Sequence, residues 1–398
     1  MSNGGIVVVG GGLAGAGAAL ELRRLGFDGR LTLIGAEPHL PYNRPPLSKA
    51  FLRGEEQFQE ALVAPHQEYE RTGIDLLLKS RVVDIDAKQS RVRLEDGGEL
   101  PYRQLLVATG GRKRRLPFEG SDLDGVFDLR TVDDSERIRN TARAGRRAVV
   151  IGLGFIGCEV AASLRMIGLE VSALDQSAVP LARVLGNEVG EAIAHLHQSR
   201  GVQLLMGERV ARLEGVGRIE RVVTESSRRL DCDLVVAGIG IEPDVDLLKA
   251  AGAAVSDGVD VDERCQTSLP NVFAAGDIAN HLHPIFGRIR VEHWNNADRQ
   301  GRAAAAAMLG RGPAYDYIHT FWSDQFDQTL EYVGLAKQWD RIEVDGSLAN
   351  LDFIARYRRD GRLLAAAAIG RGGDPEAEGE SELKEIARQI GREAALQR

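Results

Sequence analysis

The chain has 398 residues, which is too long for one hydrophobic core and indicates two or three domains. Its formal net charge of -8 argues against nucleic acid as the main partner, and its apolar runs are far shorter than the roughly 18 residues of a membrane-spanning helix. No basic segment precedes the first apolar run, so we expect no signal peptide, no membrane partner and a cytoplasmic protein. The three cysteines, Cys158, Cys232 and Cys265, form no close pair, which argues against a redox-active dithiol and a zinc site.

An apolar strand at residues 6–9 runs into a glycine-rich turn and then into an alanine-rich helix at residues 16–25. Gly10 permits the tight turn, Gly12 lets the backbone approach a phosphate, and Gly15 lets the helix pack closely on the strand. The start of the helix offers unpaired N–H groups and the positive end of its dipole to an anion. The segment therefore predicts a dinucleotide site, and the alternative is a plain tight turn in a βαβ unit.

Charged side chains follow this helix at positions where they can contact a nucleotide. A strand at residues 30–34 leads to Glu37, which can accept hydrogen bonds from ribose hydroxyls. The prolines of segment 41–49 fix its course and hold two cations in place. Arg44 can clamp a phosphate there, and Lys49 can lie beside an electron-accepting ring. A solvated loop is the alternative for this segment.

Short strands are predicted over residues 73–103, including 79–86 and 90–95. The next apolar strand ends in the small-residue turn Ala108-Thr109-Gly110, which lets the backbone pass close to a bound cofactor. The basic run at residues 112–115 is either a solvated loop or part of a docking surface for an acidic partner.

A second copy of the opening pattern follows another apolar strand. It has glycines at Gly152, Gly154 and Gly157, a helix at residues 158–167, and a further strand that ends at Asp175. Two complete fingerprints are far more specific than one, so two dinucleotides are implied. The acid at the strand end favours NADH over NADPH, because a carboxylate would repel a 2′-phosphate. Nearby Arg183 keeps that preference moderate.

Glu159 lies in the first turn of this second helix. The helix dipole favours a carboxylate there, which is a purely structural reason for the residue. The functional alternative is a contact to the nicotinamide carboxamide, or a pairing with Lys49 where the two cofactors meet.

A later strand ends at Gly276 and Asp277. Glycine allows close approach of a ligand, and the aspartate can accept hydrogen bonds from sugar-alcohol hydroxyls. Segment 291–296 and a helix predicted at residues 297–309 form a second wall for a flavin.

Two histidine pairs, His195 with His197 and His281 with His283, have a spacing of two residues. A metal site needs more ligands within reach, and on a helix this spacing directs side chains to different faces. We expect no metal site.

From His319 onward the sequence changes to alternating strands, which indicates a third domain. The tract at residues 370–380 is rich in glycine and acid and predicts a mobile loop. Trp322 is either a core residue or an aromatic cap on a flavin ring. The predicted elements are strands at 321–326, 341–344, 351–357 and 363–369 and a helix at 380–395.

With these pieces in order, the sequence resembles the FAD-dependent, NADH-using ferredoxin reductases that serve Rieske-type oxygenases and bacterial cytochromes P450. Rubredoxin reductase and apoptosis-inducing factor are relatives of that family. The resemblance runs from Gly5 to about Ile369 in unbroken motif order. Its most specific pieces are residues 41–49, 108–110, 152–159, 274–277 and 321–325.

The resemblance implies an α/β fold with two Rossmann-like dinucleotide-binding domains, as in glutathione reductase, and a C-terminal α+β domain. It implies FAD and NADH as cofactors and a [2Fe–2S] ferredoxin as partner, with rubredoxin as the alternative, in a monomer or weak homodimer. The implied domains are an FAD-binding domain at 1–112 and 238–318, an NADH-binding domain at 113–237 and a C-terminal domain at 319–398.

In this family the first fingerprint binds FAD and the second binds NADH. Lys49, Glu159 and Trp322 are the residues that the resemblance implies in catalysis. Ala36 stands where many relatives carry a second acid, so the ribose contact rests on Glu37. The cofactor-binding residues implied by motif and resemblance are Gly10, Gly12, Leu13, Ala14, Gly15, Glu37, Arg44, Lys49, Val82, Ala108, Thr109, Gly110, Arg130, Gly152, Gly154, Phe155, Ile156, Gly157, Glu159, Asp175, Arg183, Gly276, Asp277, Glu292, His293, Trp294 and Ala297.

The implied reaction is hydride transfer from NADH C4 to flavin N5, followed by two one-electron transfers to an iron–sulfur protein. Lys49 near N5 would stabilise the anionic reduced flavin. Disulfide reductases and NADH peroxidases need cysteine beside the flavin, and residues 42–51 contain none. Three alternatives remain: a rubredoxin reductase, an NADH oxidase, and a redox-dependent interaction protein like apoptosis-inducing factor.

Overall fold

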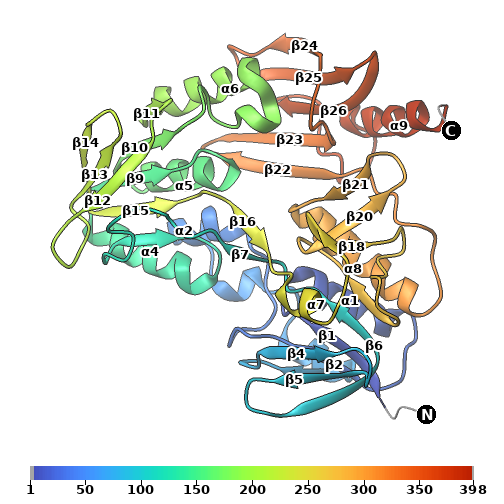
Figure 1. Cartoon of the computed structure of the whole chain (residues 1–398). Coiled ribbons are helices and arrows are strands. Elements are labelled where there is room, and N and C mark those ends of the chain that lie inside the picture. The colour runs from blue at the N-terminus through green and yellow to red at the C-terminus, as the bar shows by residue number, and fades with distance from the viewer. Residues whose placement is uncertain (1–3, 397–398) are drawn as a thin grey trace. The chain divides into compact units, whose positions relative to one another are not determined.

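A computed structural model of the chain describes residues 4–396 (Figure 1). Within residues 4–396, no helix combines the length and the apolar character that a membrane crossing requires. The chain divides into two compact units. Unit 1 draws on Met1–Asn43, Gln59–Arg112 and Glu242–His319, and unit 2 draws on Arg44–Phe58, Lys113–Ile241 and Thr320–Arg398.

Unit 1 is built on a 7-stranded sheet. In spatial order its strands are β3 (Asp75–Leu77), β2 (Leu31–Ile34), β1 (Gly5–Val9), β6 (Glu99–Val107), β5 (Arg91–Leu94) and β4 (Val82–Asp86), and β19 (Val272–Ala274) pairs with β6 off this path. The first four strands and β19 run parallel, whereas β5 pairs antiparallel with both of its neighbours, β6 and β4. β1 is buried from Ile6 to Val9, as expected of a parallel strand covered on both faces. The carboxyl ends of the parallel strands share one edge, where open α/β sheets bind ligands.

Small residues let the helices of unit 1 pack closely. Its helices are α1 (Leu13–Arg24), α3 (His66–Arg71), α7 (Asp246–Ala250) and α8 (Trp294–Met308). A Cβ on Gly301 of α8 would lie only 2.3 Å from the Ala14 carbonyl oxygen of α1, so these two helices approach each other at glycine. A second, 4-stranded sheet has the order β17 (Val255–Ser256), β18 (Gly258–Val261), β20 (Ala279–His283) and β21 (Gly287–Arg290).

Three buried histidines meet in unit 1. His281 and His283 lie two residues apart on strand β20 rather than on a helix, and their ring centroids are 5.4 Å apart. The ring of His319 lies 5.5 Å from that of His283. In the part of the chain that the structure describes, no group of three or more His, Cys, Asp or Glu side chains has a metal-binding arrangement.

Unit 2 contains a parallel 5-stranded sheet with a repeat of the β1–α1 pattern. In spatial order its strands are β11 (Gln203–Met206), β10 (Glu170–Asp175), β9 (Arg147–Ile151), β15 (Leu234–Ala237) and β8 (Val126–Asp128). A 3-stranded sheet follows the order β12 (Val210–Glu214), β13 (Arg221–Thr224) and β14 (Arg229–Asp231). The helices are α2 (Ala50–Arg53), α4 (Val132–Ala144), α5 (Phe155–Met166) and α6 (Ala182–Ser199), with the short 3-10 helix η1 (Pro45–Ser48). The 3-10 helix η2 (Phe58–Ala61) and the strands β7 (Gly111–Lys113) and β16 (Ile241–Pro243) lie where the chain passes from one unit to the other.

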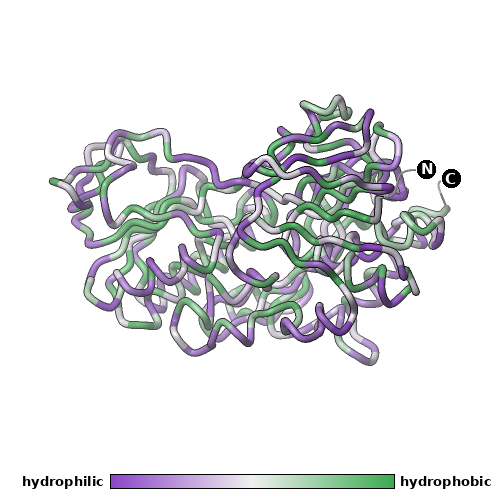
Figure 2. The backbone as a smooth tube through the Cα atoms, turned by 90° about the horizontal axis from the view of Figure 1, so that it is seen from below, coloured by the Kyte–Doolittle hydropathy of each residue, from purple (hydrophilic) through white to green (hydrophobic). Residues whose placement is uncertain are grey.

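The C-terminal part of unit 2 is an antiparallel 5-stranded sheet. Its order is β22 (Thr320–Gln325), β23 (Gln328–Gly334), β26 (Arg362–Ile369), β25 (Asp352–Arg359) and β24 (Arg341–Ser347), and α9 (Glu382–Ala395) follows it. One hydrophobic cluster joins both large sheets of this unit, with Val150 and Leu164 on one side and Phe321 and Phe353 on the other. In Figure 2 the sheet strands carry much of the green, hydrophobic backbone, whereas outlying turns are mostly purple.

The structure confirms the α/β class, both βαβ units and the strand-rich C-terminal part. The helices predicted at 16–25 and 158–167 each begin three residues earlier, at Leu13 and Phe155, because a glycine N-cap starts each helix directly after its loop. The last helix begins at Glu382 rather than 380, because Ser381 caps it by accepting from the Lys384 N–H. Sequence periodicity did not reveal α4, α6 or β23.

Residues 44–58, predicted to belong to the FAD-binding domain, group with unit 2. Hydrogen bonds to the helices of unit 2 explain this grouping. The Ser135 hydroxyl on α4 donates to the Leu47 carbonyl at 2.7 Å, and the Ser163 hydroxyl on α5 donates to the Ser48 carbonyl at 2.7 Å. The division into three domains stays a prediction.

Acidification is expected to destabilise the protein through its buried histidines. Burial lowers the pKa of His281 from 6.5 to about 4 and lowers the pKa of His319 well below 6.5. At a pH below 6.5 but above the folded-state pKa of each histidine, the unfolded chain binds a proton on that ring and the folded chain does not. The free energy of unfolding should therefore fall by at most about 1.4 kcal/mol per pH unit for each histidine as the pH drops below 6.5.

Urea titrations between pH 7 and pH 5, followed by circular dichroism, measure this slope. The variant His319→Phe removes one titrating ring while keeping an aromatic side chain in place, so its slope should be shallower. An identical slope in the variant would show that His319 does not contribute.

Candidate dinucleotide sites and a buried polar network

The first candidate site is the glycine-rich loop between β1 and α1. Gly10 has a φ of 122°, and a Cβ there would lie 2.2 Å from the Ala108 carbonyl oxygen, so the position requires glycine. A Cβ on Gly15 would lie 2.0 Å from the Gly10 carbonyl oxygen, which explains how the helix packs against its own loop. Gly12 faces open space within 4 Å and caps α1 without a side-chain hydrogen bond. This open cradle at a helix N-terminus fits a phosphate.

The second candidate site, between β9 and α5, repeats this geometry. Gly152 has a φ of 89°, and a Cβ there would lie 2.7 Å from the Gly238 carbonyl oxygen. A Cβ on Gly157 would lie 1.8 Å from the Gly152 carbonyl oxygen. Gly154 again faces open space and caps its helix without a side-chain hydrogen bond. Each loop thus has two glycines that avoid backbone clashes and one that leaves room for a ligand.

The acidic residue after each second strand is held by hydrogen bonds. The Asp175 carboxylate accepts from the N–H groups of Leu153 and Ser177, at 2.7 Å each. The Tyr42 hydroxyl donates to the Glu37 carboxylate at 2.5 Å. A carboxylate can accept about four hydrogen bonds, and Asp175 accepts these two from the backbone at the end of its strand, where a ribose hydroxyl would bind.

Two further turns of unit 1 lie at the ends of its parallel strands. In the turn after β6, the Thr109 hydroxyl donates to the Asp244 carbonyl at 3.1 Å. In the turn after β19, the Gly276 N–H donates to the Gln300 side chain at 2.8 Å. A Cβ on Gly276 would lie 3.0 Å from the Ala14 Cβ, so this turn lies against the start of α1. The structure therefore brings these predicted residues to one edge of the sheet.

The predicted second wall lies at the start of α8. The Trp294 indole N–H donates to the Asn43 side chain at 2.8 Å. Burial lowers the pKa of His293 to about 4, while Asp277 acts in the opposite direction. Glu292 accepts from an arginine of β21 at 2.5 Å. The remaining predicted residues of unit 1 are Leu13 at the start of α1, Val82 at the start of β4, Gly110 after β6 and Ala297 in α8.

Other predicted residues lie in unit 2. The Arg44 guanidinium donates to the Arg130 carbonyl. The Phe155 ring packs against the Phe321 ring of β22, with the two ring centroids 4.7 Å apart. Ile156, at the start of α5, is 45% exposed despite its apolar side chain. Arg183 is exposed in the first turn of α6.

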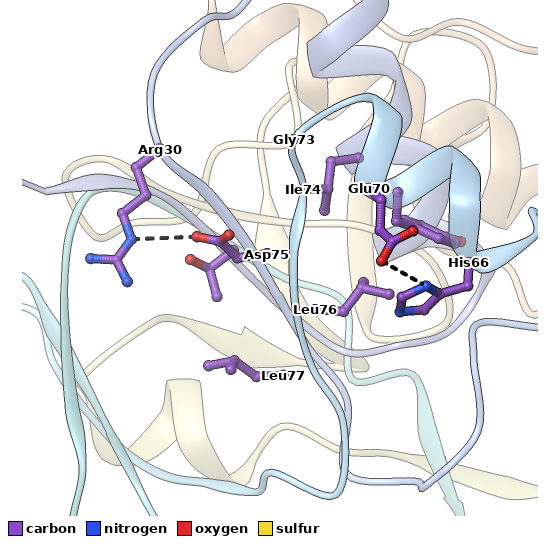
Figure 3. Close-up of a pocket in the computed structure, with 10 residues that line it drawn as sticks. Arg30, His66, Glu70, Gly73, Ile74, Asp75, Leu76 and Leu77 are labelled. Carbon is purple, nitrogen blue, oxygen red and sulfur yellow. Dashed lines mark ion pairs between the residues drawn. The ribbon is translucent and has the colours of Figure 1, made fainter.

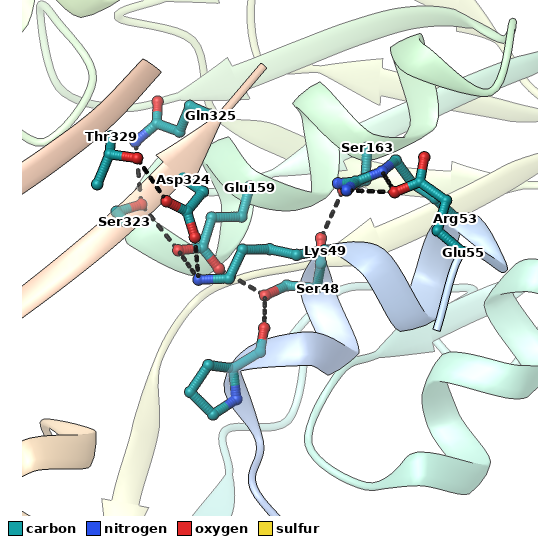
Figure 4. A network of polar contacts seen from close by, with 11 residues as sticks. Ser48, Lys49, Arg53, Glu55, Glu159, Ser163, Ser323, Asp324, Gln325 and Thr329 are labelled. Carbon is teal, nitrogen blue, oxygen red and sulfur yellow. Dashed lines mark hydrogen bonds and ion pairs between the residues drawn. The ribbon is translucent and has the colours of Figure 1, made fainter. Parts of the chain in front are cut away.

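The most closely connected group of polar side chains surrounds Glu159 of α5 (Figure 4). This carboxylate is only 4% exposed. It accepts from the Ser48 hydroxyl at 2.5 Å and the Ser323 hydroxyl at 2.8 Å, and the Lys49 Nζ lies 3.4 Å away. Burial raises the pKa of Glu159, whereas Lys49, Ser48 and Ser323 lower it. These three donors are therefore what favours the charged form.

Lys49 contacts both of the other residues predicted to be catalytic, Glu159 and Trp322. Its Nζ lies 3.4 Å from Asp324 as well as from Glu159, and 5.5 Å from the centroid of the Trp322 ring. A cation over an aromatic face is attracted by the ring quadrupole. Residues of α5 and β22 thus converge on one buried ammonium group, which follows η1 in the chain.

Sequence reasoning missed Ser48, Ser323, Gln325 and His197, which complete this network. The Gln325 amide donates to the Ser323 hydroxyl at 3.2 Å, and the His197 Nε2 lies 2.9 Å from the Gln325 carbonyl oxygen. A signal was present in β22, where Ser323 and Gln325 alternate with the half-buried positions 322 and 324 and so point inward with the core residues.

Two surface cavities lie apart from these features. One, of about 620 Å³, lies beside α3 and β3 in unit 1, where Figure 3 shows the ion pairs of Arg30 with Asp75 and of His66 with Glu70. The other, of about 560 Å³, lies in unit 2 between Thr141 and Cys232. Neither cavity is lined by a residue of the two glycine-rich loops.

Known families match nearly the whole chain. The family described as pyridine nucleotide-disulphide oxidoreductase matches residues 4–301, and the family described as reductase C-terminal matches residues 320–379.

Individual relatives match over similar lengths. Putidaredoxin reductase CamA of Pseudomonas putida is 38% identical over 93% of this chain and 89% of its own. The ferredoxin--NAD(+) reductase component of the anthranilate 1,2-dioxygenase system of Burkholderia cepacia is 39% identical over 94% of this chain and 93% of its own. The structure of a covalent putidaredoxin reductase–putidaredoxin complex superposes with a TM-score of 0.92 at 36% identity, covering 98% of this chain and 94% of that one.

The contrast between two glycines of the second loop predicts different effects of alanine. Gly154→Ala should fold normally because a Cβ meets nothing within 4 Å, yet the methyl group occupies space that a phosphate needs. We expect dinucleotide binding weaker by about tenfold, which corresponds to ~1.4 kcal/mol. Gly157→Ala should instead lower the melting temperature, because its Cβ would lie 1.8 Å from a carbonyl oxygen.

Thermal unfolding and calorimetric titration with NADH separate the two effects. Unchanged NADH affinity in a folded Gly154→Ala protein would contradict the assignment of this loop.

Proposed function

Since the chain belongs to the pyridine nucleotide-disulphide oxidoreductase family and to its ferredoxin-reductase members, we propose that it carries electrons from NADH through FAD to a [2Fe–2S] ferredoxin. That ferredoxin supplies a cytochrome P450 or a Rieske-type oxygenase. The observation that carries this proposal is the presence of two open glycine cradles in a chain whose polar centre is Lys49 and Glu159 rather than a cysteine pair.

The cysteines do not support disulfide chemistry, although the family is described by it. All three are free and buried. Burial raises the pKa of Cys232 to about 12 and also raises those of Cys158 and Cys265, so the thiols stay protonated near neutral pH. A thiolate is the reactive form of cysteine, and the reductase reaction must therefore use other groups.

The two loops are assigned to the two cofactors by their order in the chain, with the first loop binding FAD and the second binding NADH. The loop at Gly10–Gly15 binds the FAD pyrophosphate with the helix N-terminus, and Glu37 accepts hydrogen bonds from its ribose. The loop at Gly152–Gly157 binds NADH in the same way, and Asp175 at its strand end favours NADH over NADPH by repelling a 2′-phosphate. When bound, FAD takes up a hydride from NADH and releases electrons one at a time.

Lys49, Glu159 and Trp322 are assigned to the reaction itself. Helix α5 begins at Phe155 rather than at residue 158 as predicted, so Glu159 lies just beyond its first turn. From there it can bind the nicotinamide carboxamide. Lys49 holds a positive charge 3.4 Å from that carboxylate, and a fixed charge stabilises charge that develops during reduction. Trp322 lies against the ammonium group and lines the same centre.

The partner is a ferredoxin, because relatives matched over most of the chain are named as ferredoxin reductases. We propose a [2Fe–2S] ferredoxin in particular, with rubredoxin as the alternative, and a monomer or weak homodimer. The predicted cytoplasmic location belongs to the same proposal.

The function is tested by NADH-dependent reduction of cytochrome c with and without an added [2Fe–2S] ferredoxin. Strict dependence on the ferredoxin is expected, since the reduced flavin should pass single electrons to the iron–sulfur protein first. Equal rates without ferredoxin contradict the proposal. Rapid peroxide formation would indicate an oxidase, and slow oxidation of a long-lived reduced complex would indicate a redox-dependent interaction protein.

Replacing Lys49 tests the assigned reaction centre. Lys49→Ala should slow reduction of the flavin by NADH on the order of a hundredfold, because a fixed charge beside the reaction is lost. FAD should stay bound. Stopped-flow absorbance of the flavin measures the rate, and the matched control is Lys337→Ala, which removes an exposed lysine of the same unit. Equal rates in the two variants would exclude Lys49 from the reaction.

A further inference from the structure

The polar network does not end at Glu159 but continues to the last turn of helix α6. It passes from Glu159 to Ser323, from Ser323 to Gln325, and from Gln325 to His197, at 2.8, 3.2 and 2.9 Å respectively. Figure 4 shows Ser323 and Gln325 beside Glu159. Ser323 and His197 are 0% exposed and Gln325 is 2% exposed. Buried polar groups are costly unless they are hydrogen-bonded, so this chain constrains the orientation of each member.

The hydrogen bonds can be arranged in only one direction when Glu159 is ionised. The Ser323 hydroxyl has one hydrogen, which it donates to the carboxylate, so its lone pair must accept from the Gln325 amide. The Gln325 carbonyl oxygen then faces His197 and needs a proton on Nε2. Burial lowers the pKa of His197, which favours the neutral ring with that proton. Its Nδ1 has no hydrogen-bond partner among residues 4–396, as an unprotonated nitrogen allows.

We propose that His197 and Gln325 are positioning residues that aim the Ser323 hydroxyl at Glu159. They thereby keep the carboxylate ionised and directed at Lys49. The inference rests on the proposed function, in which Glu159 and Lys49 act in the reaction with NADH. A carboxamide does not pass protons along a chain, so the network orients Glu159 and is not a proton relay.

Few other ionisable groups can set the charge of Glu159. Lys49 faces it from the segment before α2, and Cys158 precedes it on α5 with Asp175 nearby. Asp324 of β22 pairs with Lys49 at 3.4 Å. Near His197, Arg200 and Asp327 pair with each other at 2.6 Å. The donated hydrogen bonds therefore contribute a distinct share of the stabilisation of the carboxylate.

Loss of the Gln325 or His197 contact frees the serine hydroxyl to turn away. A hydrogen bond to the charged form lowers a carboxyl pKa, so its weakening raises the pKa of Glu159. In the pH profile of the rate of flavin reduction, the acid limb should move to higher pH by about 0.5–1 unit. This shift corresponds to the free energy of one typical hydrogen bond. Reduction at a pH on that limb should slow by about three- to tenfold, with little change in KM for NADH.

The experiment compares the FAD-loaded wild type with His197→Phe and Gln325→Met. Stopped-flow reduction by NADH across pH gives the acid limb, and infrared titration, with Glu159→Gln subtracted, gives the pKa of Glu159 without turnover. His197→Gln, whose amide can donate to the same carbonyl, should restore most of the wild-type profile. Two positioning variants allow for the case that one of them does not fold.

The matched control is Tyr357→Phe. The Tyr357 hydroxyl is buried and donates to the Leu185 carbonyl of the same helix α6 at 2.9 Å, with no link to Glu159. The substitution Tyr357→Phe should lower the melting temperature, as the other variants do, but should leave the pH profile of flavin reduction unchanged. An unshifted infrared pKa of Glu159 in folded His197→Phe or Gln325→Met overturns the positioning role. If NADH does not reduce the wild type while the infrared shift occurs, the proposed function fails and the positioning role stands.

Discussion

The buried carboxylate of Glu159 imposes the strictest requirement on unit 2. A charged group with 4% exposure loses most of its hydration and must be compensated by donors and an opposite charge. The donors Ser48, Lys49 and Ser323 come from segments far apart in the chain, so the fold has to bring residues 48–49 and β22 to the N-terminal half of α5. Closing the network thus depends on the tertiary structure and not on any one segment.

The glycine-rich loops show a different constraint, which is steric and local. In each loop the first and last glycines are required by carbonyl oxygens that a Cβ would approach within 2.7 Å, whereas the middle glycine leaves unfilled space. The outer glycines hold strand and helix together, and the middle one leaves room for a ligand. Because one short segment contains all of these features, the two loops could be predicted from sequence, including the order of strand, loop, helix and acid.

The rest of the candidate site could not be predicted in this way. Ser323 lies 164 residues from Glu159, and Gln325 lies 128 residues from His197. Nothing local distinguishes such a serine or histidine from an ordinary buried residue, because the contact is created by tertiary packing. The same holds for residues 44–58, which contact α4 and α5 through long-range hydrogen bonds such as those from the Ser135 and Ser163 hydroxyls, and through the burial of Leu52. Local patterns determined the elements, and long-range hydrogen bonds determined which elements belong together.

Strand β22 links the C-terminal sheet to the network around Lys49 and Glu159. Its outward positions include Trp322 and Asp324, which contact Lys49, and its inward positions Ser323 and Gln325 reach Glu159 and α6. The alternation of a β-strand lets one short segment serve both faces. The sheet also shares a hydrophobic cluster with the parallel sheet, so a shift of β22 would disturb the core and the charge network together. That coupling keeps Lys49 and Glu159 in fixed geometry, as stabilisation by a preorganised charge requires.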